Sequence, residues 1–204
     1  MPQLREANPQ FTKKEKGRRE KNNMEPKTND LWVFVETKED GTARNVGIEL
    51  LTPGSMIAEK LGGKLVALVV GNKVDGAVRE AVEHGAEEVI VVEGPEYQVY
   101  TTDAYTNAVS AMVEKYAPSG MLIGATANGR DFAPRVACRL NSGLTADCTA
   151  LDVDKENGII IWTRPAFGGN LMATIICPNN RPQMSTVRPG VMQKRQREEG
   201  RQGT

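Results

Sequence analysis

Histidine and cysteine, two residue types that often carry catalysis or bind metals, are few in the 204-residue chain. His84, the only histidine, precedes Gly85 at the end of an expected helix, where an imidazole suits the helix dipole and needs no further role. The cysteines Cys138, Cys148 and Cys177 contain no C-x-x-C pair, which favours small buried thiols in a reducing cytoplasm over disulfides or a zinc site. Because P-loop, G-x-G-x-x-G and G-x-S-x-G strings are also missing, the sequence gives no positive case for a catalytic or metal site.

A strand, a Gly/Asn loop and a helix follow one another in residues 124–140, GATANGRDFAPRVACRL. Asn128 can cap this helix, and Gly129 permits a tight turn before it. Free amides at a helix start attract anions, and ligands of open α/β sheets bind at the carboxyl ends of strands. Arg130 and Arg135 add positive charge. The segment therefore predicts either a ligand site or an ordinary capped crossover with solvated arginines.

A second candidate lies in residues 163–173, TRPAFGGNLMA, where two apolar runs flank a short turn. The turn region carries Arg164, Phe167, Gly168, Gly169 and Asn170. A guanidinium offers a planar fork of donors, and beside an aromatic ring it could hold the edge of a flavin or a phosphate. The same residues also suit a tight hairpin with a surface arginine.

The elements around these segments alternate regularly. Apolar runs predict buried strands at 31–37, 64–71, 87–94 and 121–125. Helical spacing of apolar residues predicts helices from near Thr52 to 61, and at 74–84, 102–116 and 130–140. Strands that are apolar throughout and alternate with helices indicate a mainly parallel sheet covered on both faces. We therefore expect the α/β class, as a doubly wound three-layer α/β/α domain.

The pattern changes after residue 147 to strand-like runs joined by short loops, at 148–154, 158–164, 171–177 and 183–188. Asn157-Gly158 is a hairpin signal, and Gly168-Gly169-Asn170 is typical of a second turn. Pro178, Pro182 and Pro189 around the last run favour an edge strand. The parallel core is thus expected to finish in an antiparallel C-terminal extension.

Composition limits the partners and divides the chain. Lys plus Arg and Asp plus Glu both number 26, and this neutral balance gives no electrostatic reason to expect nucleic acid or an anionic membrane as partner. No run approaches the ~18 apolar residues that cross a bilayer. Residues 1–30 and 193–204 hold too few large apolar side chains to offset the entropy of ordering them. We expect a disordered leader at 1–30, one domain at 31–192 and a disordered tail at 193–204.

The opening LWVFVE and the strings GATANGRDFAPRVACRLNSGLTADCTALDVD and TRPAFGGNLMATIICPNNRPQMSTVRPGVM resemble the first domain of the electron-transfer flavoprotein alpha subunit, over about residues 30 to 192. The resemblance implies an adenine nucleotide alpha hydrolase-like fold. It also implies an electron carrier rather than an enzyme in its own right. Such a carrier works as a heterodimer with a beta subunit and passes electrons between acyl-CoA dehydrogenases or reductases and an acceptor, in the cytoplasm.

In this family FAD lies in the alpha subunit's second domain, and the beta subunit holds AMP or a second FAD. The resemblance implies that Arg164, Phe167 and Gly168 line the flavin that faces the beta subunit. Asn128 and Arg130 are the other cofactor-binding candidates. A flavin domain would follow residue 192, where this sequence continues as a charged segment, so we expect no tight FAD binding by this chain alone. The alternatives are a stand-alone adenine-nucleotide-binding module and a structural domain without redox activity.

Overall fold

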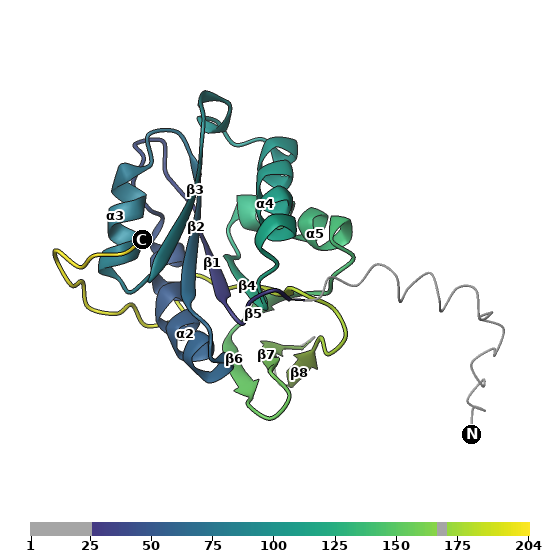
Figure 1. Ribbon diagram of the computed structural model, residues 1–204. Coiled ribbons are helices and arrows are strands. Elements are labelled where there is room, and N and C mark those ends of the chain that lie inside the picture. Colours follow the sequence, from purple (N-terminus) through teal and green to yellow (C-terminus); the bar gives the residue numbers. More distant parts are fainter. Residues whose placement is uncertain (1–25, 167–170) are drawn as a thin grey trace, which may run out of the picture.

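The computed structural model describes residues 26–166 and 171–204, so the leader expected at 1–30 lies almost entirely outside the described residues. One sheet has six strands, and every neighbouring pair in it runs parallel (Figure 1). In spatial order the strands are β3 (Glu88–Glu93), β2 (Leu65–Gly71), β1 (Leu31–Val35), β4 (Gly120–Gly124), β9 (Gln183–Val187) and β5 (Leu144–Cys148). The central strands are buried throughout, which confirms the α/β class and the parallel sheet.

Helices cover both faces of this sheet. They are α2 (Asn45–Leu61), α3 (Asp75–Glu83), α4 (Thr102–Tyr116) and α5 (Ala127–Arg139), with a short 3-10 helix η1 (Pro95–Tyr97). Figure 1 shows α2 and α3 on one side of the sheet and α4 and α5 on the other. Within the described ranges, no helix has both the length and the apolar character needed to span a bilayer.

Successive residues of β1 point to opposite faces and separate two apolar cores. Leu31, Val33 and Val35 join the core under α2 and α3. Trp32 and Phe34 join the core under α4 and α5. The expected three-layer arrangement is therefore confirmed, with a dry core on each side of the sheet.

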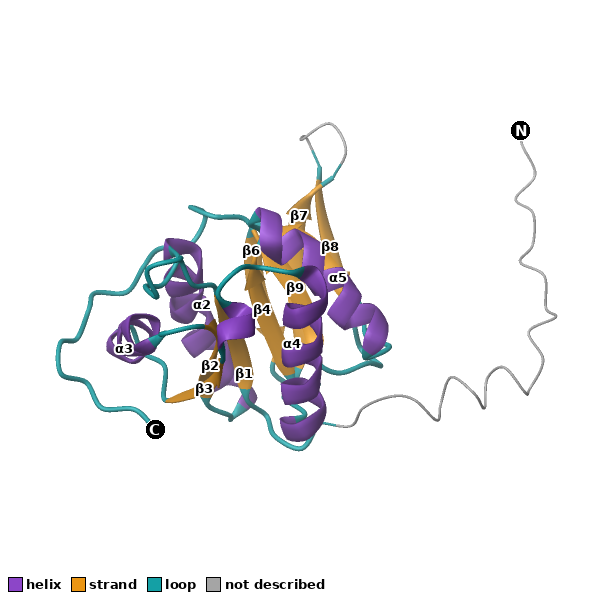
Figure 2. Cartoon of the chain, turned by 90° about the horizontal axis from the view of Figure 1, so that it is seen from above, coloured by secondary structure: helices purple, strands orange, loops and turns teal. Residues whose placement is uncertain are grey.

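A second sheet has three antiparallel strands, β6 (Ala150–Asp154), β7 (Ile159–Pro165) and β8 (Met172–Ile176). Asn157-Gly158 lies in the loop between β6 and β7, as predicted, and Gly158 has a φ of +63°, which suits glycine. Figure 2 shows this sheet beside the parallel one. A small antiparallel sheet is confirmed for the first three runs, but it is not C-terminal, because the run at 183–188 returns to the parallel sheet. The turn expected at 168–170 lies outside the described residues.

The predicted start of α2 near Thr52 is wrong. The helix begins at Asn45 and carries Pro53 in its interior. Proline cannot donate the helical hydrogen bond, and this usually costs about 3 kcal/mol. Val46 and Ile48 precede the proline and are buried against the sheet, so packing outweighs the lost hydrogen bond and extends the helix towards its N-terminus.

The predicted edge strand at 183–188 is also wrong. β9 lies inside the parallel sheet, between β4 and β5, and all of its residues are buried. Pro182 precedes β9 and Pro189 follows it, so neither proline removes an N–H from the hydrogen-bond ladder. The edge on this side of the sheet is β5, whose mixed burial gives no continuous apolar run of the kind that predicted the other strands.

The segment 193–204 has no helix or strand, yet polar contacts place it along the domain. Arg197 Nε lies 2.6 Å from Glu83 Oε2 at the end of α3. The backbone N–H of Val89 on β3 donates to the carbonyl of Thr204 at 2.8 Å. In Figure 1 the yellow segment accordingly ends beside α3 and β3. The segment was expected to be disordered because it has too few apolar residues. It is instead held by an ion pair and by backbone hydrogen bonds, which do not depend on apolar residues.

Candidate functional site

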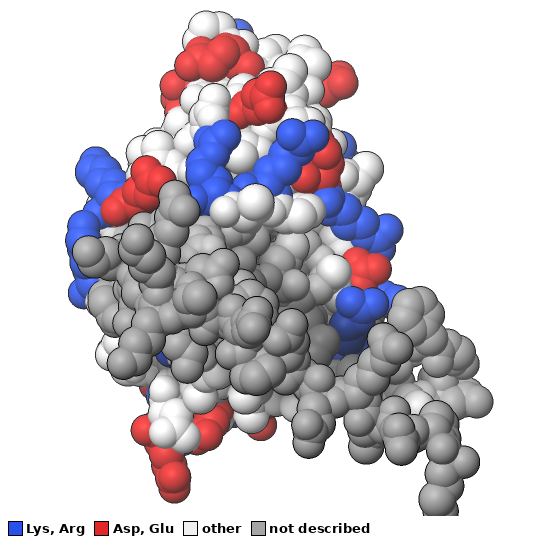
Figure 3. All heavy atoms as spheres, turned by 90° about the vertical axis from the view of Figure 1, so that its right-hand side faces the viewer, with Lys and Arg blue, Asp and Glu red and all other residues white. Residues whose placement is uncertain are grey.

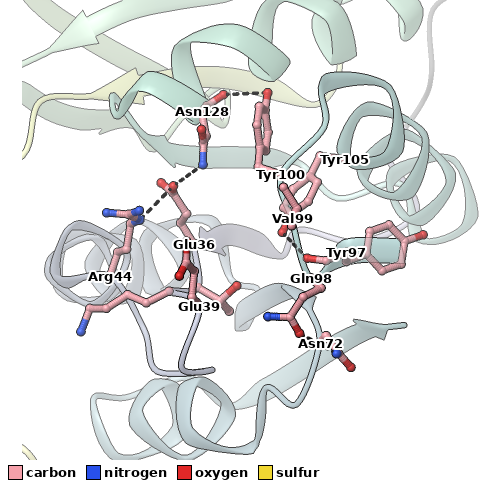
Figure 4. A pocket seen from close by; sticks show the side chains of 12 residues that line it. Glu36, Glu39, Arg44, Asn72, Tyr97, Gln98, Val99, Tyr100, Tyr105 and Asn128 are labelled. Carbon is pink, nitrogen blue, oxygen red and sulfur yellow. Dashed lines mark hydrogen bonds and ion pairs between the residues drawn. The ribbon is translucent and has the colours of Figure 1, made fainter. Parts of the chain in front are cut away.

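A cavity of about 230 Å³ opens at the carboxyl ends of β1 and β4 (Figure 4). From β1 the chain crosses through α2 to β2, and from β4 it crosses through α5 to β5. In the strand order of the sheet, β2 and β5 lie on opposite sides of the β1–β4 pair, so the two crossovers run in opposite directions. This reversal is the position where ligands of doubly wound sheets bind. The cavity is lined by Glu36, Thr37, Lys38, Glu39, Arg44, Asn72, Tyr97, Gln98, Val99, Tyr100, Tyr105 and Asn128.

Glu36 follows β1 directly and is only 5% exposed. Its Oε2 accepts a hydrogen bond from Thr126 Oγ1 at 2.6 Å, and its Oε1 accepts one from Asn128 Nδ2 at 2.8 Å. Arg44 Nε, at the start of α2, lies 3.1 Å from Oε1. Figure 4 shows the Arg44 and Asn128 side chains pointing at this carboxylate. A buried carboxylate is stable here because three donors replace its hydration.

Aromatic side chains form the opposite wall of the cavity. The rings of Tyr100 and Tyr105 lie 5.0 Å apart between centroids, and Tyr105 Oη donates to the carbonyl of Tyr97 at 3.1 Å. Tyr100 Oη donates to Asp131 Oδ2 at 2.7 Å, and Thr102 Oγ1 donates to the same oxygen. Burial, followed by the hydrogen bond to Asp131, raises the pKa of Tyr100 to about 12. The phenol therefore stays neutral and anchors the loop after η1 to α5.

The Tyr100 hydroxyl is expected to make wild type more stable than Tyr100→Phe, and this difference in stability should disappear in alkali. Below pH 10 the phenol is protonated in both the folded and the unfolded state, and its hydrogen bond to Asp131 favours folding. Between pH 10 and about 12 only the unfolded Tyr100 loses its proton, so folding becomes less favourable as pH rises. Urea unfolding should therefore show wild type more stable than Tyr100→Phe below pH 10, with the difference shrinking up to pH 12. A difference that does not change with pH would contradict this linkage.

Asn128 and Arg130, the two cofactor-binding candidates from the 124–140 segment, lie in different surroundings. Asn128 lies in the cavity, but the prediction that it caps α5 is wrong. The cap is Thr126, whose Oγ1 accepts from the Gly129 N–H at 3.0 Å. Thr126 has the extended backbone that a cap requires, while Asn128 is already helical and free to donate to Glu36. Arg130 turns away from the cavity and pairs with Asp147, with Nε 3.1 Å from Oδ1.

Arg164 lies near the end of β7, opposite Ala173 on β8. The neighbouring Thr163 carbonyl accepts from the Thr149 N–H at 2.8 Å, which fixes this end of β7 to the end of β5. Burial raises the pKa of the Cys148 thiol to about 11, and the positive charge of Arg164 is among the causes that oppose this rise. Arg164 thus lies in the part of β7 that is fixed to the end of β5.

The structure thus separates the predicted site residues into two groups. Arg130 reaches the carboxyl end of β5 through its ion pair with Asp147, and the part of β7 that carries Arg164 is fixed to the same end by the hydrogen bond from Thr149 to Thr163. Asn128 belongs instead to the cavity between β1 and β4. The other two candidates, Phe167 and Gly168, lie outside the described residues.

The remaining chemistry-bearing residues fit structural roles. His84 is buried, with Nδ1 2.7 Å from the Glu80 carbonyl at the end of α3. Of the expected buried thiols Cys148 is buried, but Cys138 is exposed because it lies on the outer face of α5. In the described part of the chain, no three His, Cys, Asp or Glu residues gather where they could hold a metal ion.

Sequence reasoning missed Glu36 and Arg44. One signal was available, because Glu36 directly follows a buried strand and so stands at the carboxyl edge of the sheet. Its partners Thr126 and Asn128 are about ninety residues away in the chain, so no local pattern reveals the cluster.

Comparison with known proteins agrees with this architecture. A family model described as "Electron transfer flavoprotein domain" matches residues 31–204. "Protein FixB" of Clostridium saccharobutylicum is 54% identical over 164 residues, which cover 80% of this chain and 48% of the relative. "Electron transfer flavoprotein subunit alpha" of Thermoanaerobacterium thermosaccharolyticum is 49% identical over 174 residues, covering 85% of this chain and 52% of the relative.

"Acryloyl-CoA reductase electron transfer subunit beta" of Anaerotignum propionicum is 46% identical, with 81% of this chain and 51% of the relative covered. This chain therefore spans about half the length of the curated relatives it matches. The match nevertheless includes both sheets and every helix described above. The chain belongs to the electron transfer flavoprotein family.

Proposed function

We propose that this chain is the first domain of an electron-transfer flavoprotein alpha subunit. As a heterodimer with a beta subunit, it passes electrons between acyl-CoA dehydrogenases or reductases and an acceptor. The membership of the family and the names of its relatives support this role. Three free cysteines are compatible with a reducing cytoplasm as its location.

The observation that carries the proposal is the environment of Arg164. Among the described residues, no carboxylate forms an ion pair with Arg164, whereas Arg130 is neutralised by Asp147. An unpaired guanidinium at the base of a hairpin is free to bind an anionic or hydrogen-bonding group of a partner molecule. We propose that Arg164, together with Phe167 and Gly168 farther along the sequence, contacts FAD held mainly by the beta subunit or by a second domain of the alpha subunit.

FAD in that position would supply the electron-transfer chemistry, and this chain would supply charge. Reduced flavin gains negative charge, which a nearby guanidinium stabilises. Arg164 would therefore raise the reduction potential of the flavin. The isolated chain contributes only one wall of such a site, so we expect FAD to bind tightly only in the assembled heterodimer.

An apolar surface on the outer face of β8 is the proposed contact for the beta subunit. It lies on the opposite face of the small sheet from Arg164, which pairs with Ala173. On β8, Met172 is 57% exposed and Ile176 is 51% exposed, and the even-numbered spacing puts them on one face of the strand. Leu171, immediately before the strand, is 69% exposed. Apolar side chains gathered on one face are typical of a protein–protein contact.

The test is co-expression with a beta subunit and the remainder of an alpha subunit, followed by flavin analysis and redox titration. We expect Arg164→Ala to lower the two-electron potential by about 30 mV or more, which corresponds to the loss of one charge-assisted hydrogen bond. Arg164→Lys should recover part of that shift because it keeps the charge. Arg139→Ala, at the far end of α5, is the control and should leave the potential unchanged. A potential that Arg164→Ala does not move would defeat the flavin assignment.

A further inference from the structure

The cavity between β1 and β4 has the position and the donors of a phosphate-binding site, yet a side chain of the protein already occupies the anion position. Doubly wound sheets place the phosphate of a ligand at such a reversal, against the first turn of a helix. Here the first turn of α5 contributes Thr126 and Asn128, and the start of α2 contributes Arg44. A hydroxyl, a carboxamide and a guanidinium are the groups that proteins use for phosphate.

We propose that Glu36 is a resident anion that fills this position and makes the cavity reject phosphate, and with it nucleotides. Its two carboxylate oxygens take up the three donors at 2.6, 2.8 and 3.1 Å. The carboxylate is attached to the backbone just after β1 and is 5% exposed, so a free anion cannot compete with it for the same donors.

The rest of the cavity lining reinforces this exclusion. A phosphate placed in the open part of the cavity would lie beside the Glu36 carboxylate and near Glu39, and like charges repel. Lys38, the other cation of the lining, donates to Thr42 Oγ1 at 3.2 Å. On the remaining wall, Asn72 Nδ2 donates to Gln98 Oε1 at 2.7 Å. The open space therefore disfavours a group with negative charge.

This role of Glu36 is independent of the proposed flavin contact, which lies at the β7–β8 hairpin. It accounts for a domain that keeps a nucleotide-binding architecture while its proposed cofactor contact lies elsewhere. Glu36 acts here as a specificity-determining residue, because its charge decides which ligands the cavity admits.

The experiment measures the melting temperature and the binding of inorganic phosphate and AMP for this chain, Glu36→Ala and Glu36→Ser. We expect no binding to wild type at millimolar concentrations and at least about tenfold tighter binding to both variants. Phosphate at ten times the dissociation constant measured for a variant should raise the melting temperature of that variant by about 3 °C. This rise is counted beyond the general salt effect seen with wild type. The double variant Glu36→Ala with Arg44→Ala should lose this gain.

Two results would overturn the proposal. The first is phosphate or AMP binding to wild type with NMR shifts at Thr126 and Asn128. The second is the absence of a specific phosphate effect on both variants, whether they are folded or unfolded in plain buffer, because an anion site emptied of its carboxylate must gain stability when the anion returns. Both results can be obtained without a beta subunit or flavin, so they do not depend on the proposed electron-transfer role.

Discussion

Gly129→Ala is expected to destabilise the domain by about 3 kcal/mol, at the upper end of the usual cost of overpacking. A Cβ at Gly129 would lie 2.0 Å from the Gly124 carbonyl oxygen and 3.2 Å from Ile123 Cγ2. The first of these atoms belongs to the backbone of β4, so no side-chain rotation can relieve the contact. The first turn of α5 would have to move away from the sheet.

That movement has a second consequence, because the same turn positions Thr126 and Asn128 against Glu36. Urea unfolding monitored by circular dichroism measures the loss of stability. Cys138→Ala, on the exposed face of the same helix, is the matched control and should change stability by no more than about 0.5 kcal/mol. If Gly129→Ala unfolded at the wild-type urea midpoint, helix and strand would not be as close as described.

Gln183→Leu is expected to cost about 2 to 4 kcal/mol, because it leaves the buried N–H of Ile160 and the half-buried carbonyl of Gly158 without partners. Gln183 is fully buried at the start of β9. Its Oε1 accepts from the Ile160 N–H at 2.8 Å, and its Nε2 donates to the Gly158 carbonyl at 2.9 Å. One carboxamide thus joins the parallel sheet to β7, the strand that carries Arg164.

Leucine has a similar volume but neither donor nor acceptor, so the change isolates the hydrogen bonds from packing. Unfolding in urea gives the total loss, and amide exchange at Ile160 reports whether β7 opens before the parallel sheet. Gln202→Leu is the control, because Gln202 is exposed and donates only to the Gly200 carbonyl at 3.3 Å among the contacts described for its side chain. Equal stability of the Gln183 and Gln202 variants would show that the carboxamide does not hold the two sheets together.

Most of the architecture could be predicted from the sequence, because the spacing of apolar residues that marks each strand and helix is contained in a short stretch of the chain. The helix at 102–116 matches α4 at both ends, since Thr102 opens it and Pro118 follows its end. The hairpin at Asn157-Gly158 was equally local. Failures occurred where tertiary packing overruled a local signal, as at Pro53 inside α2 and at the prolines that flank β9.

The candidate sites were less predictable, for a different physical reason. Arg164 and Arg130 were recognisable as cations next to glycine-rich turns, but only the fold reveals that Asp147 neutralises Arg130. The Glu36 cluster joins the end of one strand with the first turns of two helices, and its members are brought together by strand order rather than by spacing in the chain. Single-sequence patterns do not contain strand order, so they could locate the carboxyl edge of the sheet but not the residues that meet there.

The contact of residue 204 with β3 has a consequence for the behaviour of the domain in concentrated solution. β3 is an outer strand of the parallel sheet, and its Val91 is 42% exposed. Unpaired strand backbone of this kind is a template for self-association and fibre growth. Thr204 occupies the beginning of that strand, since its N–H donates to the Glu87 carbonyl at 3.1 Å and its own carbonyl accepts from Val89. Residue 204 thereby covers the beginning of β3 and reduces the length of unpaired backbone that this edge offers to another strand.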